Sequence, residues 1–199
     1  MNRTELVVRT IAETAIANEK YFGDLDAVVG DGDFGYSLAR GFEKLLDGWD
    51  DLDRTDSGTF LKRCGMTIAS RIGGTSGPLW GTAFLRAGAA AVDPLDRARV
   101  VTMLRAAIDG IKARGQSDLG DKTLLDALVP FTDFLEKSDD ISGAAQAARQ
   151  AAEATSSMVA KRGRAAYTGE RSRGSVDAGA MAVAVIAERI SDVWQGAGS

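Results

Sequence analysis

Apolar residues recur at intervals of three and four along nearly the whole chain, which is the spacing of one face of an α-helix. Val8, Ile11, Ala12, Ala15 and Ile16 form one such stripe, and no segment shows the strict alternation of a β-strand. The pattern predicts about eight helices and an all-α fold, with alanine-rich faces that allow close helix packing. The stripes span residues 8–16, 38–45, 61–68, 84–91, 100–111, 124–128, 144–158 and 181–193.

Several helix ends are also indicated. Thr55 or Asp56 can cap the third stripe, Pro78 suits a first helical turn, and Asp177 can cap the last helix. The stripe at 144–158 is expected to end near Gly163.

Composition limits the class of protein. A length of 199 residues without a Pro/Ser-rich linker predicts one domain over 1–199. The net charge of -4, without a block of like charges, argues against nucleic acid or a membrane surface as partner. No apolar run reaches transmembrane or signal-peptide length, and Cys64 is the only cysteine, so we expect a cytoplasmic protein.

The chain contains no histidine. This excludes His-ligated zinc and every nucleophile that is activated by histidine. Any chemistry must therefore come from carboxylates, hydroxyls, Lys, Arg, the backbone and hard metal ions.

Four polar junctions separate the predicted helices, and in an up-and-down array alternate junctions lie at the same end. Their loops can therefore converge on one site. The junctions are residues 23–37, 73–77, 115–123 and 163–179.

The first junction places Asp26, Asp31 and Asp33 within eight residues, interspersed with glycines. Carboxylates this close repel one another unless a cation lies between them, and an all-oxygen set favours Mg²⁺, Mn²⁺ or Ca²⁺. An EF-hand loop is excluded. Counted from Asp31, its fifth and twelfth positions would be Gly35 and Phe42, and neither side chain can supply the oxygen ligand that an EF-hand requires there. The alternative is a solvated turn whose aspartates cap a helix.

The other junctions carry weaker signals. Thr75 and Ser76 lie among glycines before a helix, which suits an anion-binding loop. A simple turn between two helices would show the same sequence pattern. Residues 115–123 nearly match a P-loop, but Asp121 is an extra residue and a helix precedes the loop, so we interpret it as a polar loop. Arg164, Arg171 and Arg173 suit phosphate contacts or surface ion pairs equally well.

Taken together, the junctions resemble the L subunit of bacterial dihydroxyacetone kinases, which also occurs as the ATP-binding domain of single-chain forms. The matching segments occur in family order. They are L-D-A-V-V-G-D-G-D-F-G, G-G-T-S-G-P-L-W-G-T-A-F-L, G-D-K-T-L-L-D-A-L-V-P and G-R-A-A-Y-T-G-E-R-S-R-G-S-V-D-A-G-A.

The resemblance implies an eight-helix antiparallel barrel that binds ADP or ATP in the loops at one end. Asp26, Asp31 and Asp33 would hold a pair of Mg²⁺ ions that bridge the phosphates. The phosphate and ribose side would be lined by Phe34, Gly35, Tyr36, Ser37, Thr75 and Ser76, and the rest of the nucleotide would be bordered by Gly120, Arg164, Asp177, Ala178 and Gly179.

Three positions depart from the family pattern, which usually has His at Phe34, Asn at Ser37 and Pro at Ala178. The aspartates are unchanged, so phosphoryl transfer is still expected. The departures leave the acceptor open between dihydroxyacetone and a four-carbon ketose such as erythrulose. The resemblance also extends to the nucleotide domains of fatty-acid kinases.

In the resembling family a separate K subunit holds the ketone covalently on a histidine, so this chain is expected to be half of an enzyme. The phosphate source is either ATP or a phosphotransferase-system protein that rephosphorylates bound ADP, and the sequence leaves both open. It also leaves open a homodimer. The rival hypotheses are a non-enzymatic nucleotide sensor that docks on a regulator or kinase, and a purely structural helical module.

Overall fold

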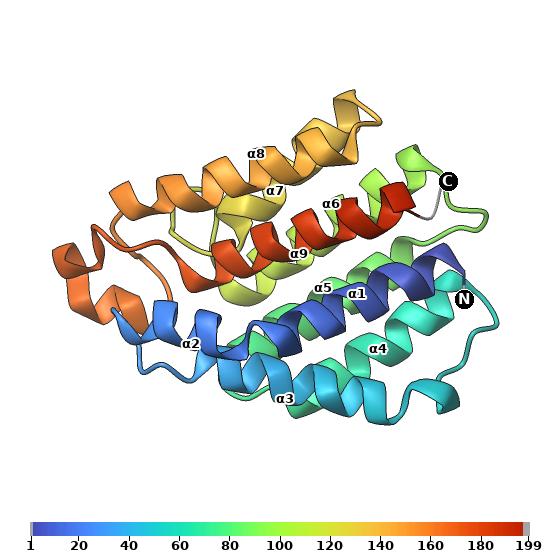
Figure 1. Cartoon of the computed structure of the whole chain (residues 1–199), viewed down its shortest axis with the longest axis horizontal. Helices are drawn as coiled ribbons and strands as arrows, with labels where there is room; N and C mark the ends of the chain where they lie inside the picture. Colours follow the sequence, from blue (N-terminus) through green and yellow to red (C-terminus); the bar gives the residue numbers. More distant parts are fainter. Residues whose placement is uncertain (1, 197–199) are drawn as a thin grey trace.

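The computed structural model describes residues 2–196, and these contain α-helices, short 3-10 helices and no β-strand (Figure 1). The prediction of an all-α fold is confirmed. The α-helices are α1 (Arg3–Ala17), α2 (Glu19–Ala27), α3 (Phe34–Asp47), α4 (Ser57–Arg71), α5 (Ser76–Ala90), α6 (Arg97–Gly115), α7 (Leu125–Lys137), α8 (Ile141–Ala154) and α9 (Ala178–Gly196). The 3-10 helices are η1 (Trp49–Asp51), η2 (Thr155–Ser157) and η3 (Arg164–Ser172).

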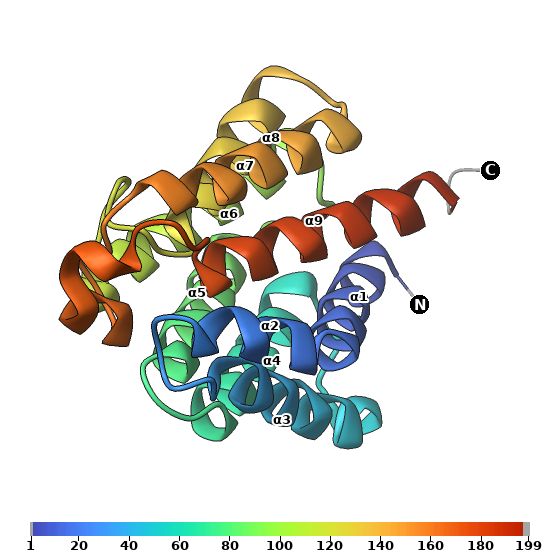
Figure 2. The same cartoon turned by 60° about the vertical axis from the view of Figure 1, so that its left-hand side comes forward.

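Eight of the helices form a closed ring. α1 packs against α3, each helix from α3 to α8 packs against the next, and α9 packs against both α8 and α1. The apolar stripes face the inside of this ring, where Phe42, Leu125 and Ala148 are fully buried. The structure is therefore the antiparallel helical barrel that the family resemblance implied (Figures 1 and 2).

Two boundaries differ from the sequence prediction. Helix α2 was not predicted, because Phe22 is its only fully buried residue and its face is too polar to give a clear stripe. Helix α8 ends at Ala154 rather than near Gly163, and Met158 lies outside it. Thr155 accounts for this early end, because its hydroxyl accepts a hydrogen bond of 2.8 Å from the N–H of Asp177, which joins the chain to the start of α9.

The direction of the helices brings the four polar junctions to one end of the barrel. The chain returns to this end between α2 and α3, α4 and α5, α6 and α7, and α8 and α9 (Figure 1, left). Helices α3, α5, α7 and α9 therefore all begin at this end, and the N-terminus of each helix carries a partial positive charge. We call this end of the barrel the site end.

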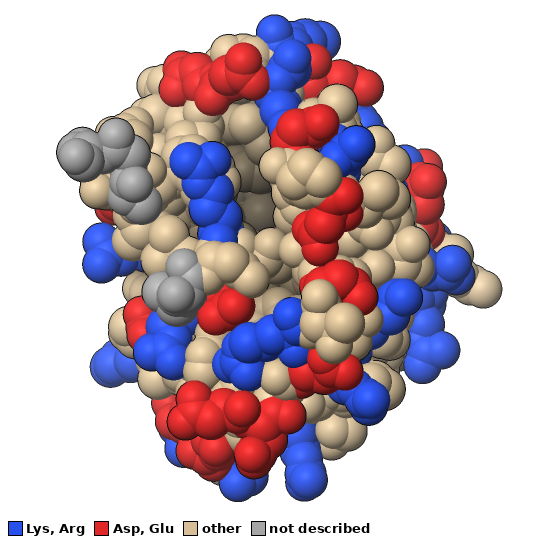
Figure 3. Space-filling view, turned by 90° about the vertical axis from the view of Figure 1, so that its right-hand side faces the viewer, with Lys and Arg blue, Asp and Glu red and all other residues tan. Residues whose placement is uncertain are grey.

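Helix α1 begins and helix α9 ends at the opposite end of the barrel (Figure 1). Figure 3 shows that face, on which acidic and basic side chains are interspersed around a hollow between the helices. Within residues 2–196, no helix combines the length and the apolar character needed to cross a membrane.

The predicted helix caps are present. Asp56 accepts a hydrogen bond of 2.7 Å from the N–H of Thr59 at the start of α4, and Asp177 accepts one of 2.8 Å from Ala180 at the start of α9. Pro78 lies in the first turn of α5, where its missing N–H is tolerated.

Helices α4 and α5 pack most closely, through glycines that face each other. A Cβ added at Gly81 would lie 2.5 Å from the Cβ of Ala69, and one at Gly65 would lie 2.9 Å from the backbone N of Leu85. Backbone atoms cannot move aside as a flexible side chain can, so these positions require glycine. The pairing fixes where α5 begins, and the start of α5 forms one wall of the site end.

Gly81→Val is expected to destabilise the protein by about 2 kcal/mol, because the added methyl groups overpack a contact that cannot open. Gly48→Ala is the matched control, since Gly48 follows α3 with a φ of -97° and has only one distant neighbour. Urea unfolding followed by circular dichroism measures both. Equal midpoints for the two variants would show that the α4–α5 contact is not tight.

Candidate functional site

A cavity of about 810 Å³ opens at the site end and is lined by all four polar junctions. The convergence that the alternation of helices predicted is therefore present. From the predicted set, the cavity lining contains Asp26, Asp31, Asp33, Phe34, Ser37, Thr75, Ser76, Arg164, Asp177, Ala178 and Gly179.

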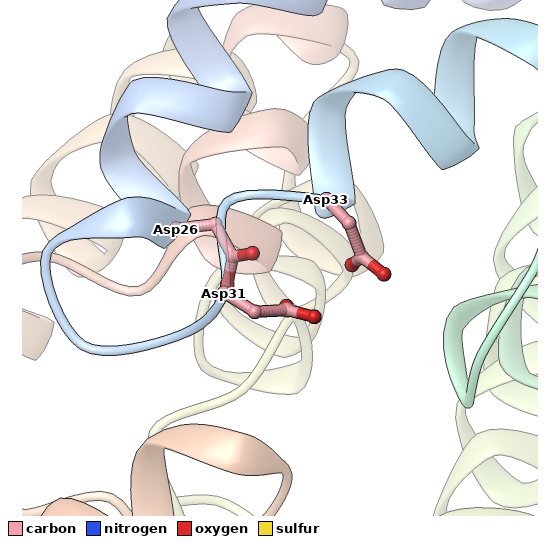
Figure 4. Close-up of side chains that lie close together, drawn as sticks. All are labelled: Asp26, Asp31 and Asp33. Atoms are coloured by element: carbon pink, nitrogen blue, oxygen red, sulfur yellow. The ribbon is translucent and has the colours of Figure 1, made fainter.

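The three aspartates of the first junction lie together on one side of this cavity (Figure 4). Each offers a carboxylate oxygen, and these oxygens all lie within 4.8 Å of one another. Asp26 is half-buried, whereas Asp31 and Asp33 are exposed. We refer to Asp26, Asp31 and Asp33 as the carboxylate triad.

The turn between α2 and α3 sets the shape of the triad. Asp26 belongs to the last turn of α2, and its carbonyl accepts a hydrogen bond of 2.6 Å from the N–H of Gly30. Its carboxylate accepts one of 3.3 Å from the N–H of Phe34, the first residue of α3. Phe34 also packs its ring against Phe22, with 6.3 Å between the centroids. An aromatic residue at position 34 thus helps to hold α3 against α2.

Arg164, from η3 on the opposite loop, reaches across to the triad. Its guanidinium forms an ion pair with Asp31, and a second with Asp33 at 3.2 Å. The sequence suggested Arg164 as a phosphate contact. In the structure its positive charge lies beside Asp31 and Asp33 and offsets the repulsion between their carboxylates. Arg171 and Arg173 do not line the cavity.

The donor set fits a hard divalent cation. Mg²⁺ takes oxygen ligands at about 2.1 Å, so oxygens on opposite sides of the ion lie about 4.2 Å apart. The oxygens of the triad already lie within 4.8 Å, and the exposed side chains of Asp31 and Asp33 can rotate to close the difference. The charge of Arg164 beside two of them shows that the site attracts cations.

The other wall of the cavity suits an anion. Helix α5 begins at Ser76, and its N-cap residue Thr75 makes no side-chain hydrogen bond to the first turn. The N–H groups of this first turn and the positive end of the α5 dipole attract phosphate oxygens. The cavity therefore combines a cation site and an anion site.

Asp177 marks the boundary of the cavity at the start of α9. Loss of water contact raises its pKa to about 7, and the neighbouring charge of Asp126 acts in the same direction, whereas the N–H of Ala180 and the Lys122 ammonium lower it. Ala178, the first residue of α9, is largely buried but also contributes to the cavity lining.

Three of the predicted residues do not line the cavity: Gly35, Tyr36 and Gly120. Gly35 lets α3 approach α2, because a Cβ there would collide with the carbonyl of Glu19. Tyr36 is exposed on the outer face of α3, with the Arg40 guanidinium 5.3 Å from its ring centre. Gly120 donates its N–H to the carboxylate of Asp126, in the first turn of α7, at 2.6 Å.

Sequence reasoning missed several residues that line the cavity, among them three that carry polar side-chain groups on the loops. They are Ser117 and Lys122 of the third junction and Tyr167 of the fourth. The near match to a P-loop drew attention to Lys122 but gave it no role, and Tyr167 had no signal beyond its place in a glycine-rich loop.

Comparison with known proteins gives a consistent result. A family model described as the DAK2 domain matches residues 28–192. The chain is 36% identical over 195 residues to the PEP-dependent dihydroxyacetone kinase, ADP-binding subunit DhaL, of Escherichia coli, covering 92% of this chain and 93% of that protein. It is 38% identical to the L-erythrulose 1-kinase of Mycolicibacterium smegmatis, covering 94% of this chain and 34% of that one.

Among solved structures, the dihydroxyacetone kinase of C. freundii in complex with AMP-PNP and Mg²⁺ matches with a TM-score of 0.80 and 26% identity. The match covers 97% of this chain and 34% of that kinase. The chain therefore spans about a third of the single-chain kinases, and nearly all of the E. coli subunit.

Proposed function

The chain belongs to the DAK2 domain family, and from this premise we propose that it is the nucleotide-binding subunit of a kinase for a small ketose. The observation that carries the proposal is the carboxylate triad facing the uncapped start of α5 across one cavity. A nucleoside polyphosphate bound with Mg²⁺ needs both walls, one for the metal and one for the phosphates.

Asp26, Asp31 and Asp33 would hold Mg²⁺, or a pair of Mg²⁺ ions. When bound, Mg²⁺ bridges phosphate oxygens and neutralises the charge that develops during phosphoryl transfer. The fixed turn between α2 and α3 positions the triad, and Phe34 keeps that turn against α2. The similar kinase of C. freundii was solved with AMP-PNP and Mg²⁺, which supports this assignment.

Thr75, Ser76 and the first turn of α5 would bind the phosphates, with Ser37 beside them on α3. The start of α9, at Asp177, Ala178 and Gly179, would border the remainder of the nucleotide. Each of these groups orients the substrate, and phosphoryl transfer demands little else from the protein.

The lining contains no histidine, and the amine of Lys122, which could otherwise add to a ketone, is held by three main-chain carbonyls. A small polar ketone binds weakly without a covalent link, and the chain has no histidine to supply one. We therefore propose that a separate K-type subunit presents the acceptor, which is dihydroxyacetone or a four-carbon ketose. The similar proteins include kinases named for each of these.

Exposed apolar residues on the loops of the site end support such docking. Val28 is 63% exposed, Leu119 is 49% exposed and Tyr167 is 91% exposed, and they lie on three different junctions. Large apolar residues gathered around a site entrance are typical of protein contact surfaces. We refer to these three residues as the apolar rim.

Native mass spectrometry of the purified protein tests the nucleotide assignment. We expect a bound species with the added mass of ADP or ATP and Mg²⁺, lost on addition of EDTA. Retained ADP that does not exchange with ATP would favour a phosphotransferase-system protein as phosphate donor. Bound nucleotide with no transfer to any K-type subunit would favour a nucleotide sensor, and no affinity for Mg²⁺-nucleotide would refute the proposal.

Arg164→Ala is expected to act in opposite directions on Mg²⁺ alone and on Mg²⁺-ADP. The variant removes a cation that competes with the metal for Asp31 and Asp33, so Mg²⁺ alone should bind more tightly. It also removes a phosphate contact, so Mg²⁺-ADP should bind about tenfold more weakly. Isothermal titration calorimetry measures both, and Arg171→Ala, outside the cavity lining, is the control. If the variant lost affinity for both Mg²⁺ alone and Mg²⁺-ADP, Arg164 would not compete with the metal for Asp31 and Asp33.

A further inference from the structure

Lys122 is a buried lysine whose side chain points into the protein rather than toward solvent. It is only 2% exposed, although it belongs to a polar loop. Its ammonium donates hydrogen bonds to the main-chain carbonyls of Ser175, at 2.6 Å, and of Met158, at 3.3 Å, and it also donates to the carbonyl of Ser172. An ammonium has three N–H donors, so these three acceptors satisfy it completely.

The position of Lys122 is unusual in two further respects. Its φ is 63°, a left-handed conformation that few residues other than glycine adopt. It also has no carboxylate among its hydrogen-bond partners, although Asp177 lies near enough to influence it. A strained backbone and a buried charge together persist only where the surrounding structure requires them.

The three carbonyls belong to one segment, residues 158–177, which follows η2, forms η3 and leads into α9. This segment carries Arg164 to the carboxylate triad and ends at Asp177 on the edge of the cavity. Its other ties include the Lys161 N–H to the Asp121 carbonyl at 3.1 Å and the Gly174 N–H to the Ser156 carbonyl at 2.8 Å. The Ala160 N–H also donates to the Ser172 hydroxyl at 2.8 Å and so joins the beginning of the segment to its later part. Lys122 adds a connection from the third junction to both parts at once.

We propose that Lys122 is a positioning residue: its ammonium gathers the carbonyls of Met158, Ser172 and Ser175 and so holds the segment that places Arg164 over the metal and phosphate site. The near P-loop sequence around Lys122 then has an explanation that is not phosphate binding. This inference rests on the proposed nucleotide function and adds how the site is kept in shape.

Removing the ammonium should loosen the segment before any nucleotide is added. Lys122→Met keeps the length and apolar stem of the side chain but leaves three carbonyls without their donor. Limited trypsin digestion of the nucleotide-free protein should cut after Arg162, Arg164, Arg171 or Arg173 about tenfold faster than in the unchanged protein, because local opening exposes these bonds. Lys112→Met is the matched control. Lys112 lies in the last turn of α6, and its ammonium forms an ion pair with Asp118 of the third junction.

The affinity for Mg²⁺-ADP should also fall, because the loosened segment no longer holds Arg164 at the site. Lys122→Met is expected to weaken Mg²⁺-ADP binding about tenfold, as is usual when a residue that supports a ligand is lost. If Lys122 acts through Arg164, the same substitution made in the Arg164→Ala background should cost less, by about threefold or more. A residue with a general structural role would give two additive losses.

The proposal is overturned by unchanged trypsin cleavage, by unchanged affinity, or by additive losses in the double variant. Circular dichroism verifies that Lys122→Met folds, and Lys122→Gln, which keeps two N–H donors, replaces it if it does not. Loss of folding in both variants would also overturn the proposal, because Lys122 would then support the whole barrel. Failure of the unchanged protein to bind Mg²⁺-ADP would refute the proposed function instead, while the trypsin assay would still test Lys122.

Discussion

The chain by itself is expected to transfer no phosphate from ATP to any three- or four-carbon ketose, whereas transfer should appear when a K-type subunit is added. The cavity suits a nucleotide and a metal, its lining contains no histidine, and the Lys122 ammonium is bound to main-chain carbonyls rather than free to attack a ketone. Transfer in the complex should also depend on Mg²⁺, because the phosphate charge must be neutralised beside three carboxylates.

The experiment is a phosphorylation assay with ATP and a panel containing dihydroxyacetone and both erythrulose enantiomers, with and without the K-type subunit from the same organism. If a phosphotransferase-system protein is the donor, that protein and its phosphate source replace ATP. Robust turnover by this chain without any partner would refute the half-enzyme proposal and indicate a self-contained kinase.

The apolar rim offers a control that separates docking from nucleotide binding. A double variant, Val28→Ser with Leu119→Ser, removes two exposed apolar side chains that lie outside the cavity lining. It should reduce transfer in the complex and leave the affinity for Mg²⁺-ADP unchanged. Transfer at the unchanged rate would show that the K-type subunit docks elsewhere.

The second large effect is expected for Asp31→Asn and Asp33→Asn. Each removes one charge from the triad but keeps the shape of the side chain, so the affinity for Mg²⁺-ADP should fall by an order of magnitude or more, roughly 1.4 kcal/mol for each tenfold. ADP measured without Mg²⁺ should bind no more weakly than to the unchanged protein, because the carboxylates repel phosphate when no metal lies between them.

The fold should survive both substitutions. Asp31 and Asp33 are exposed, their ion pairs with Arg164 are solvent-accessible, and exposed pairs contribute at most about 1 kcal/mol. Asp24→Asn is the matched control, since Asp24 pairs with Lys20 at 2.6 Å and is not part of the triad. Calorimetry with ADP and Mg²⁺, together with thermal unfolding, tests both expectations. If both Asp31→Asn and Asp33→Asn bound Mg²⁺-ADP with the affinity of the unchanged protein, the assignment of a metal to this site would be wrong.

Much of the fold could be predicted because helical periodicity is a local property. The stripe from Val100 to Ile111 became α6, and Asp56 and Asp177 cap helices where their place before a stripe suggested. Helix α2 could not be predicted in this way, since it rests against α3 and α9 with little buried apolar surface of its own.

The candidate site divides in the same manner. Three aspartates within eight residues lie close along the chain, so the sequence by itself indicated the carboxylate triad on which the proposed metal site rests. The even alternation of helices also required the four polar junctions to share one end.

Only the tertiary structure decided which side chains of those junctions meet. It brought Arg164 to Asp31 and Asp33 from a loop more than a hundred residues away, turned Tyr36 outward, and buried Lys122 among carbonyls of another loop. These contacts depend on the packing of helices whose exposed ends carry no periodic signal, and each one joins segments distant in the chain. Composition and spacing specify which chemistry is available, whereas the closed ring of helices determines which groups act together.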